Sequence, residues 1–226
     1  MPGLEHLPFA EVWFHEIDEA RWREASAAAR AIGKTGLEVW TTDKTPGVVS
    51  FLEERGYEPV RHYVISELDV TAAHDPEPPA FPLVTFAERP DLAPALFEIA
   101  LESYRDQPGR SEQQIESFES WRSWGLDPHP PEAYFVALED GRVLGYGFLE
   151  VRDDEWWNGF TAIARAERGR GVAGAIKRGQ IAWAKAHGIP TLRTANERRL
   201  ESMLAMNSRF GYRPLYTEIV LRGPAA

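Results

Sequence analysis

The sequence contains no cysteine. This absence excludes disulfide bonds, a thiolate nucleophile and any metal site built on cysteine. No apolar run approaches the length of a membrane-spanning helix, and the opening residues MPGLEHLPFAEVW lack the basic and apolar regions of a signal peptide. We therefore expect a cytoplasmic protein that has no membrane partner.

Positive charge is also scarce: 25 lysines and arginines stand against 35 acidic residues, which gives a formal net charge of −10. Such a balance argues against nucleic acid as the main partner, and a compact basic patch in this chain therefore indicates a local anion site. The 226 residues, 43% of them hydrophobic, suffice to bury the core of one large domain or of two small ones.

A proline-rich stretch divides the chain. Thr71–Pro82, TAAHDPEPPAFP, has four prolines and no periodic apolar pattern. Because proline stiffens such a connection, it predicts a short spacer rather than a floppy tether. We expect an N-terminal unit over residues 1–70, a linker over 71–82 and a larger domain over 83–226.

The larger segment predicts alternating strands and helices. Asp140 and Gly141 form a strong two-residue turn signal between two apolar runs, which indicates a hairpin. Strands are expected at 81–88, 133–151 (the hairpin), 156–164, 190–196 and 212–223, and helices at 91–106, 111–125 (starting at Ser111), 172–187 and 199–210. This order predicts an α/β domain.

Between the strand at 156–164 and the helix that follows lies an arginine- and glycine-rich loop, Arg168 to Gly171. A glycine-rich turn that opens a helix directs unpaired N–H groups and the helix dipole at one point, which is an anion site. Lys177 and Arg178 add positive charge nearby. Neither the dinucleotide fingerprint nor the P-loop pattern is present. The loop taken alone is equally consistent with a solvated basic turn.

The surroundings of the loop favour the anion site. Arg168-x-x-Gly171-x-Ala173 after a strand, followed by a helix, TLRTAN and MLAMNSRFGYRP, resembles the GNAT superfamily of acyl-CoA-dependent N-acyltransferases from Pro82 to about Gly223. The resemblance implies a mixed, mostly antiparallel sheet with a splayed central strand pair, acetyl-CoA as co-substrate and no metal. It also implies a set of cofactor-binding residues: Ile163, Ala164 and Arg165 for the pantetheine arm, Arg168, Gly169, Arg170, Gly171, Val172, Ala173 and Gly174 for the diphosphate, and Asn196 and Asn207 as polar contacts.

The sequence departs from the family pattern at the expected general acid. Many relatives have a tyrosine at the position of Asn207, and it protonates the departing thiolate; asparagine has no useful acidity. For the base that deprotonates the amine we expect Glu155 and Glu150, since both can lie at strand ends facing the cleft. A solvated acidic turn is the alternative for either. His129 is expected to be an ordinary loop histidine.

The N-terminal unit resembles the second half of the larger domain. With a constant shift along the chain, Gly33 falls on Gly188, Leu37 on Leu192 and Pro59 on Pro214 without a gap, which suggests a duplication. The first copy has Trp13–Asp18 at the loop position, with no glycine and no arginine, and should not bind a diphosphate. It is incomplete, so its strand edges must be covered by the second copy or by a second chain in a homodimer.

These observations predict a tandem GNAT-like N-acetyltransferase that acylates a primary amine. The acceptor stays open between a small molecule, an antibiotic and a peptide N-terminus. The first alternative is a non-catalytic CoA- or acyl-CoA-binding or regulatory protein, and the second is a loop that binds another phosphate ligand.

Overall fold

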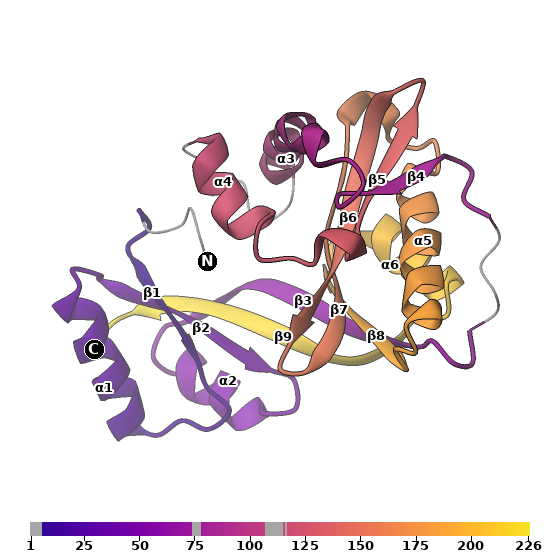
Figure 1. Ribbon diagram of the computed structural model, residues 1–226. Helices are drawn as coiled ribbons and strands as arrows, with labels where there is room; N and C mark the ends of the chain where they lie inside the picture. The colour runs from indigo at the N-terminus through magenta and orange to yellow at the C-terminus, as the bar shows by residue number, and fades with distance from the viewer. Residues whose placement is uncertain (1–5, 74–77, 107–114, 116) are drawn as a thin grey trace.

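The computed structural model describes residues 6–73, 78–106, 115 and 117–226. Within these residues nine strands form one sheet in the order β1-β2-β9-β3-β8-β7-β6-β5-β4 (Figure 1). In this part of the chain only the pairs β1–β2 and β7–β8 are parallel. The predicted α/β class with a mostly antiparallel sheet is therefore confirmed.

The elements have the following bounds. The strands are β1 (Phe9–Trp13), β2 (Gly36–Thr42), β3 (Glu58–Asp69), β4 (Leu83–Thr85), β5 (Tyr134–Glu139), β6 (Arg142–Arg152), β7 (Glu155–Ile163), β8 (Thr191–Glu197) and β9 (Arg213–Pro224). The α-helices are α1 (Glu19–Ala31), α2 (Pro46–Glu53), α3 (Ala93–Asp106), α4 (Phe118–Gly125), α5 (Val172–Ala186) and α6 (Glu201–Arg209). Residues 74–77 of the predicted linker and the predicted helix start at Ser111 lie outside the described residues. No helix in the described part is both long and apolar enough to cross a bilayer.

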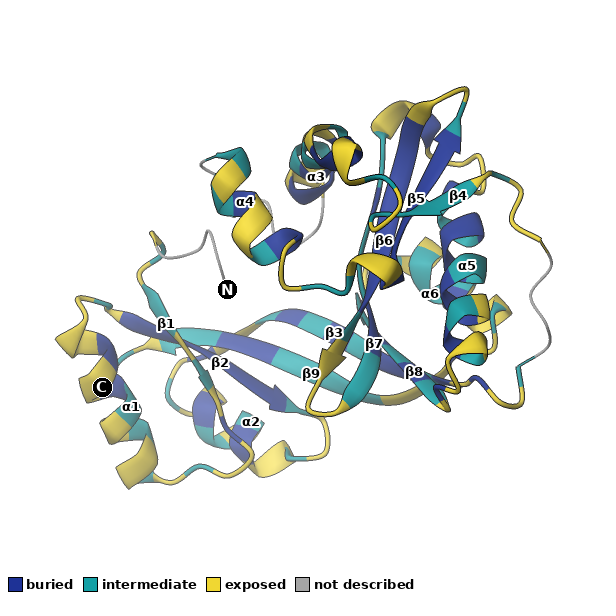
Figure 2. Ribbon diagram, viewed as in Figure 1, coloured by how far each residue is buried: buried dark blue, intermediate teal, exposed yellow. Residues whose placement is uncertain are grey.

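Strands β5 and β6 form the predicted hairpin, and both of their faces are buried (Figure 2). The turn residues Asp140 and Gly141 have φ values of 51° and 79°, as a tight two-residue hairpin turn requires. Val136 packs with α3 and α4 on one face of the sheet, whereas its neighbour Phe135 packs with α5 on the other. Because successive strand residues point to opposite faces, a continuous apolar run is needed here.

The order helix, strand, helix, strand occurs twice along the chain. Strand β2 begins at Gly36 and β8 at Thr191, and β3 begins at Glu58 and β9 at Arg213. Both offsets equal the shift that aligns Gly33 with Gly188 in the sequence. Helices α1 and α2 pack on the first set of strands around a separate apolar cluster that includes Val39. Duplication itself stays a prediction.

The last strand of each set is inserted between strands of the other set. Strand β9 lies between β2 and β3, so that Glu218 is paired with both Thr42 and Tyr63. Strand β3 in turn pairs with β8, where Val64 lies opposite Asn196. Strands β2 and β3 of the N-terminal unit thus have partners on both sides within one chain, while β1 forms one end of the sheet. The N-terminal unit is part of the sheet that carries the larger domain.

A buried charge cluster joins the three strands of this exchange. Glu38 on β2 is 4% exposed and accepts hydrogen bonds from Arg61 on β3 and, over 2.7 Å, from Arg222 on β9. A buried carboxylate needs such partners, because an unpaired buried charge is strongly unfavourable. The cluster therefore favours this strand register over others.

Candidate active site

Strands β7 and β8 diverge in the middle of the sheet. They pair only at Trp157–Arg193 and Asn158–Thr194. Beyond these pairs β7 continues along β6 as far as Ile163, while β8 continues along β3. The edge of residues 159–163 that faces β8 is therefore without a partner strand in the described part of the chain. This strand gap, between residues 159–163 and 195–197, is the splayed pair that the resemblance to the GNAT superfamily implied.

The closed end of the strand gap is held by a buried polar network. The Asn158 Nδ2 donates to Gln180 Oε1 on α5 over 2.9 Å, and the Tyr212 hydroxyl donates to Asn158 Oδ1. Gln180 Nε2 donates in turn to the Phe148 carbonyl over 3.1 Å. Because buried polar groups that all find partners make a rigid arrangement, the point at which the strands separate is fixed.

The arginine- and glycine-rich loop connects the open end of the gap to α5. Gly169 and Gly171 have φ values of 79° and 88°, in the left-handed region that glycine adopts most easily. A Cβ atom on either would meet nothing within 4 Å. Gly171 is the N-cap of α5 and offers no capping side chain. The first N–H groups of the helix consequently lack intrahelical and side-chain cap partners, which suits an anion.

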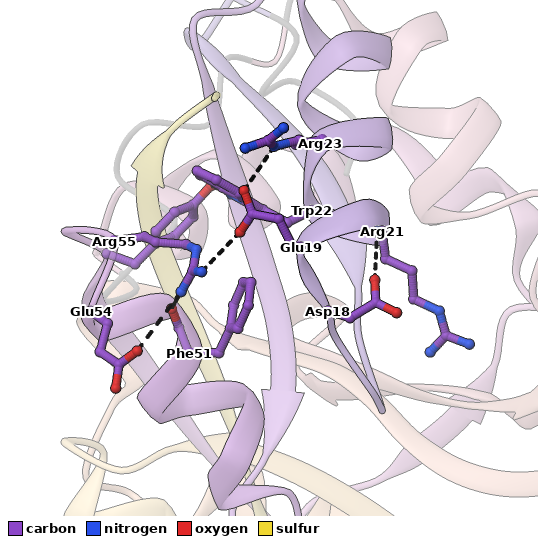
Figure 3. A network of polar contacts seen from close by, with 9 residues as sticks. Asp18, Glu19, Arg21, Trp22, Arg23, Phe51, Glu54 and Arg55 are labelled. Atoms are coloured by element: carbon purple, nitrogen blue, oxygen red, sulfur yellow. Dashed lines mark hydrogen bonds and ion pairs between the residues drawn. The ribbon is translucent and has the colours of Figure 1, made fainter.

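The corresponding helix start in the N-terminal unit has the opposite character. Asp18 caps α1, and its side chain accepts from the Arg21 N–H over 2.8 Å (Figure 3). The helix N-terminus already has a carboxylate there, which would repel a diphosphate. Phe14 is buried, whereas Trp13 is 44% exposed although it stacks on Trp40.

The loop arginines divide into two groups. Arg165 and Arg168 both pair with Asp106 at the end of α3, at 2.8 and 2.7 Å, and this pairing lowers the pKa of the Asp106 carboxyl. Arg170 is bound instead by Glu139, at 2.7 Å, and by Glu167.

One large cavity, of about 950 Å³, contains the strand gap and the loop. It is lined by nine of the residues that the sequence predicted: Glu150, Ile163, Arg168, Gly169, Gly171, Val172, Ala173, Gly174 and Asn196. The structure leaves five predicted residues outside the lining: Ala164, Arg165, Arg170, Glu155 and Asn207.

Besides Arg165 and Arg170, whose carboxylate partners are given above, Glu155 and Asn207 also have side-chain partners. Glu155 pairs with Arg193 at the start of β7, and that arginine also binds Glu67. Asn207 is 2% exposed and donates from Nδ2 to Asn196 Oδ1 over 2.6 Å. The structure thus places Asn207 behind a residue of the cavity wall, where it orients Asn196.

On the far side of the strand gap the cavity has an aromatic and acidic wall, of which Glu150 is the member predicted from the sequence. Its members come from both units of the chain: Trp40, Tyr63, Trp124, His129, Phe148, Glu150, Arg152, Phe160 and Glu218. Trp40 and Tyr63 stack with ring centroids 5.5 Å apart. Burial raises the pKa of the Glu218 carboxyl. This wall offers apolar rings and carboxylates to a second substrate.

His129 and Glu150 form a pair within this wall. The His129 Nδ1 lies 3.6 Å from Glu150 Oε2, and the imidazole stacks on Phe148 at 3.8 Å between centroids. Burial lowers the pKa of His129 despite the nearby carboxylate, so the ring is neutral and able to accept a proton at neutral pH. Nothing in the loop sequence DPHPPE distinguishes His129, because Phe148 and Glu150 are distant in sequence.

Comparison with known proteins agrees with this geometry. The model of the acetyltransferase (GNAT) family matches residues 93–212. No curated protein matches the sequence. The fold is similar to that of a GCN5-related N-acetyltransferase from Sphaerobacter thermophilus, with a TM-score of 0.75, 18% identity and coverage of 96% of this chain and 73% of that one.

Two further structures share the fold. A tandem GNAT protein from the clavulanic acid biosynthesis pathway, solved without AcCoA, has a TM-score of 0.71 at 20% identity, covering 98% of this chain and 76% of that one. A GCN5-related N-acetyltransferase from Kribbella flavida has a TM-score of 0.61 at 19% identity, covering 95% and 79%. With a family match over more than half of its length, the chain belongs to the GNAT family of acetyltransferases, which are in general acyl-CoA-dependent.

Proposed function

We propose that this protein transfers an acetyl group from acetyl-CoA to a primary amine. The observation that carries the proposal is that one continuous cavity holds all the parts of the site. It joins the uncapped N-terminus of α5, the unpaired edge of β7 and the wall that contains His129 and Glu150. An activated thioester needs little more than a second substrate held close to it, a proton acceptor and a site for developing negative charge.

The diphosphate of acetyl-CoA fits the loop. The N–H groups at residues 169–174 and the dipole of α5 supply an anion site, and the left-handed glycines leave its space free of side chains. Arg168 lies at this site but is paired with Asp106. The pantetheine arm, which has its own amide groups, would add to the free edge of β7 at residues 159–163.

The acceptor amine would lie on the far side of the gap. Glu218 attracts a cationic amine, as does Glu150, although one oxygen of Glu150 is already bound by Arg152. The rings of Trp40 and Tyr63 suit either the carbon skeleton of the amine or the cation itself. Both of these rings belong to the N-terminal unit. That unit therefore contributes to acceptor binding in this proposal, and residues 13–18 hold no cofactor.

His129 is the group we assign to take the proton from the attacking nitrogen, directly or through one water. Its imidazole is neutral near pH 7 because burial lowers its pKa, and Glu150 stabilises the imidazolium that forms. As the nitrogen attacks, the carbonyl oxygen gains negative charge, and free N–H groups on the β7 edge can stabilise it. Glu155 has no part in this step, because its carboxylate is bound to Arg193 outside the cavity.

The experiment is a thiol-release assay with acetyl-CoA and a panel of amines that includes diamines, aralkylamines, aminoglycosides and short peptides. We expect release of CoA to depend on the amine and to yield an acetylated product of matching mass. As a site control, Trp40→Ala should raise KM for the amine and leave the KM for acetyl-CoA unchanged. Binding of acetyl-CoA without amine-dependent release would instead identify a non-catalytic binding protein.

A further inference from the structure

Lys177 is a buried lysine that has no role in the reaction steps described above. It lies on α5, one and a half turns after Gly171, and is 3% exposed while lining the cavity. Lys185, on the same helix, differs: it lies outside the cavity lining and donates to the Ala73 carbonyl over 2.6 Å. A lysine is almost never fully buried unless it is paired, so the position of Lys177 needs an explanation.

The surroundings of the Lys177 amine are neutral. Its Nζ lies 4.9 Å from the centroid of the Tyr212 ring, and the Tyr212 hydroxyl is bound to Asn158. The charged groups that line the same cavity near α5 stand on other elements or further along the helix: Asp106, Glu167, Arg168, Arg178 and Arg209. Burial, with no carboxylate to offset it, lowers the pKa of Lys177 to about 7. The amine therefore exchanges its proton near neutral pH.

The location of Lys177 matches the reacting end of the co-substrate. Helix α5 runs from the loop at Gly171 back towards the closed end of the strand gap, where Gln180 binds Asn158. Lys177 is placed between these two points, about 9 Å along the helix axis from Gly171. An arm that enters the gap from the diphosphate site has its thioester towards that closed end.

We propose that Lys177 is the acid that protonates the departing thiolate of CoA. The assignment rests on the proposed acetyl transfer and supplies a group that its chemistry needs. Asn207, at the position of the expected acid, cannot donate an acidic proton, is buried outside the cavity lining and is occupied with Asn196. Among the described residues that line the cavity around α5, Lys177 is the one that is both buried and able to give up a proton near neutral pH.

Protons and electrons balance in the proposed acetyl transfer. The acceptor ammonium first releases one proton to solvent, which frees the lone pair of its nitrogen. That nitrogen then forms a bond to the acetyl carbon, and His129 takes one further proton from it. The C–S bond then breaks with its electron pair on sulfur, and the Lys177 ammonium gives its proton to that sulfur. His129 returns its proton to solvent and Lys177 regains one. The negative diphosphate and the nascent thiolate both favour the ammonium form before transfer, and a thiol is a weaker acid than a lysine ammonium of pKa about 7.

The test compares Lys177→Met with Lys185→Met, the same change on the same helix but outside the cavity. For Lys177→Met we expect kcat at pH 7 to fall on the order of 100-fold, with little change in the calorimetric Kd of CoA. In the wild type and in Lys185→Met, kcat should decline on the alkaline side as Lys177 loses its proton; in Lys177→Met this decline should vanish. An unchanged kcat and pH profile in Lys177→Met would overturn the proposal. A higher Kd of CoA in Lys177→Met, with the alkaline decline of kcat retained, would also overturn it.

A second measurement does not depend on the variant. NMR titration of the lysine side chains in the wild type should show one amine that titrates near pH 7 and shifts upward when CoA is added. Lysines that all titrate above pH 9 would overturn the proposal. If no amine in the panel is acetylated, the proposed function fails and this assignment with it. If amines are acetylated but Lys177→Met behaves as Lys185→Met does, only the assignment of the acid fails.

Discussion

The Asn207 side chain donates a 2.6 Å hydrogen bond to Asn196, and the Thr194 hydroxyl donates to the same oxygen over 3.3 Å. Asn196 lines the cavity while Asn207 does not. A residue at the position of the family's acid therefore acts here through its neighbour: it holds Asn196 in place at the wall of the strand gap.

This arrangement predicts the effect of Asn207→Ala. Loss of one buried hydrogen bond of about 1 kcal/mol should raise the KM for acetyl-CoA about fivefold. The shape of the pH–rate profile should not change, because the amide does not titrate. Ser208→Ala, at the exposed next position, is the control and should leave both quantities unchanged. Disappearance of a titrating group in Asn207→Ala would show that the position has a chemical role.

The His129–Glu150 pair predicts an acid limb in the pH–rate profile. Burial lowers the pKa of His129 from its ordinary value of 6.5. A base must be unprotonated, so kcat should rise with pH through a value below 6.5. At neutral pH His129 is already unprotonated, and its titration should no longer change kcat. His129→Gln should lower kcat and remove this limb. His187→Gln, at the exposed C-cap of α5, should keep it; equal profiles for the two variants would exclude His129 as the base.

The buried amine of Lys177 also predicts how stability depends on pH. Its pKa is about 7 in the folded protein, against 10.5 for an ordinary exposed lysine. Between these values the unfolded chain binds a proton that the folded chain does not, so this group makes the protein more stable as pH rises from about 7 to about 10.

Lys177→Met should remove that dependence and stabilise the protein most below pH 7, where the wild type must bury a charge. Urea unfolding at pH 6 and pH 9 measures both effects. A free energy of unfolding changed by the same amount at the two pH values would contradict the assignment of a lowered pKa.

The strand exchange predicts that the larger domain does not fold alone. Within the described residues β9 pairs only with β2 and β3, and both belong to the N-terminal unit. A chain of residues 79–226 would leave β9 without a partner and β8 with an open edge, so we expect aggregation or no cooperative unfolding transition. Co-expression with residues 1–73 should restore a soluble complex. A soluble, fully active 79–226 chain would contradict this prediction.

Some of these features can be predicted from the sequence and others cannot. Gly169 and Gly171 stand out because a left-handed loop before a helix has few alternatives to glycine, and the offset from Gly33 to Gly188 shows the related segments. The exchange of β3 and β9 cannot be read in the same way. Both strands have the same pattern, so the sequence does not say which neighbour each one takes.

Apart from Glu150, the aromatic and acidic wall of the cavity was not predicted, for a related reason. Trp40, Tyr63 and Glu218 are far apart in the chain and meet only because β9 inserts between β2 and β3. Lys177 lies in a helix with ordinary amphipathic periodicity, so the sequence does not mark it as buried. Its burial follows from the packing of α5 on the closed end of the strand gap. Glu155 shows the converse: an acidic residue next to a predicted strand end lies outside the cavity, because Arg193 binds it.

The central claim is that the loop at residues 169–174 binds the diphosphate of acetyl-CoA, and calorimetry with CoA on two glycine variants tests it most directly. Gly171 and Gly188 stand at opposite ends of α5, both have positive φ, and a Cβ atom on either meets nothing within 4 Å. Glutamate therefore introduces similar strain and the same charge at each. We predict that Gly171→Glu abolishes CoA binding while Gly188→Glu binds CoA as the wild type does; equal affinity in a folded Gly171→Glu protein would contradict the account.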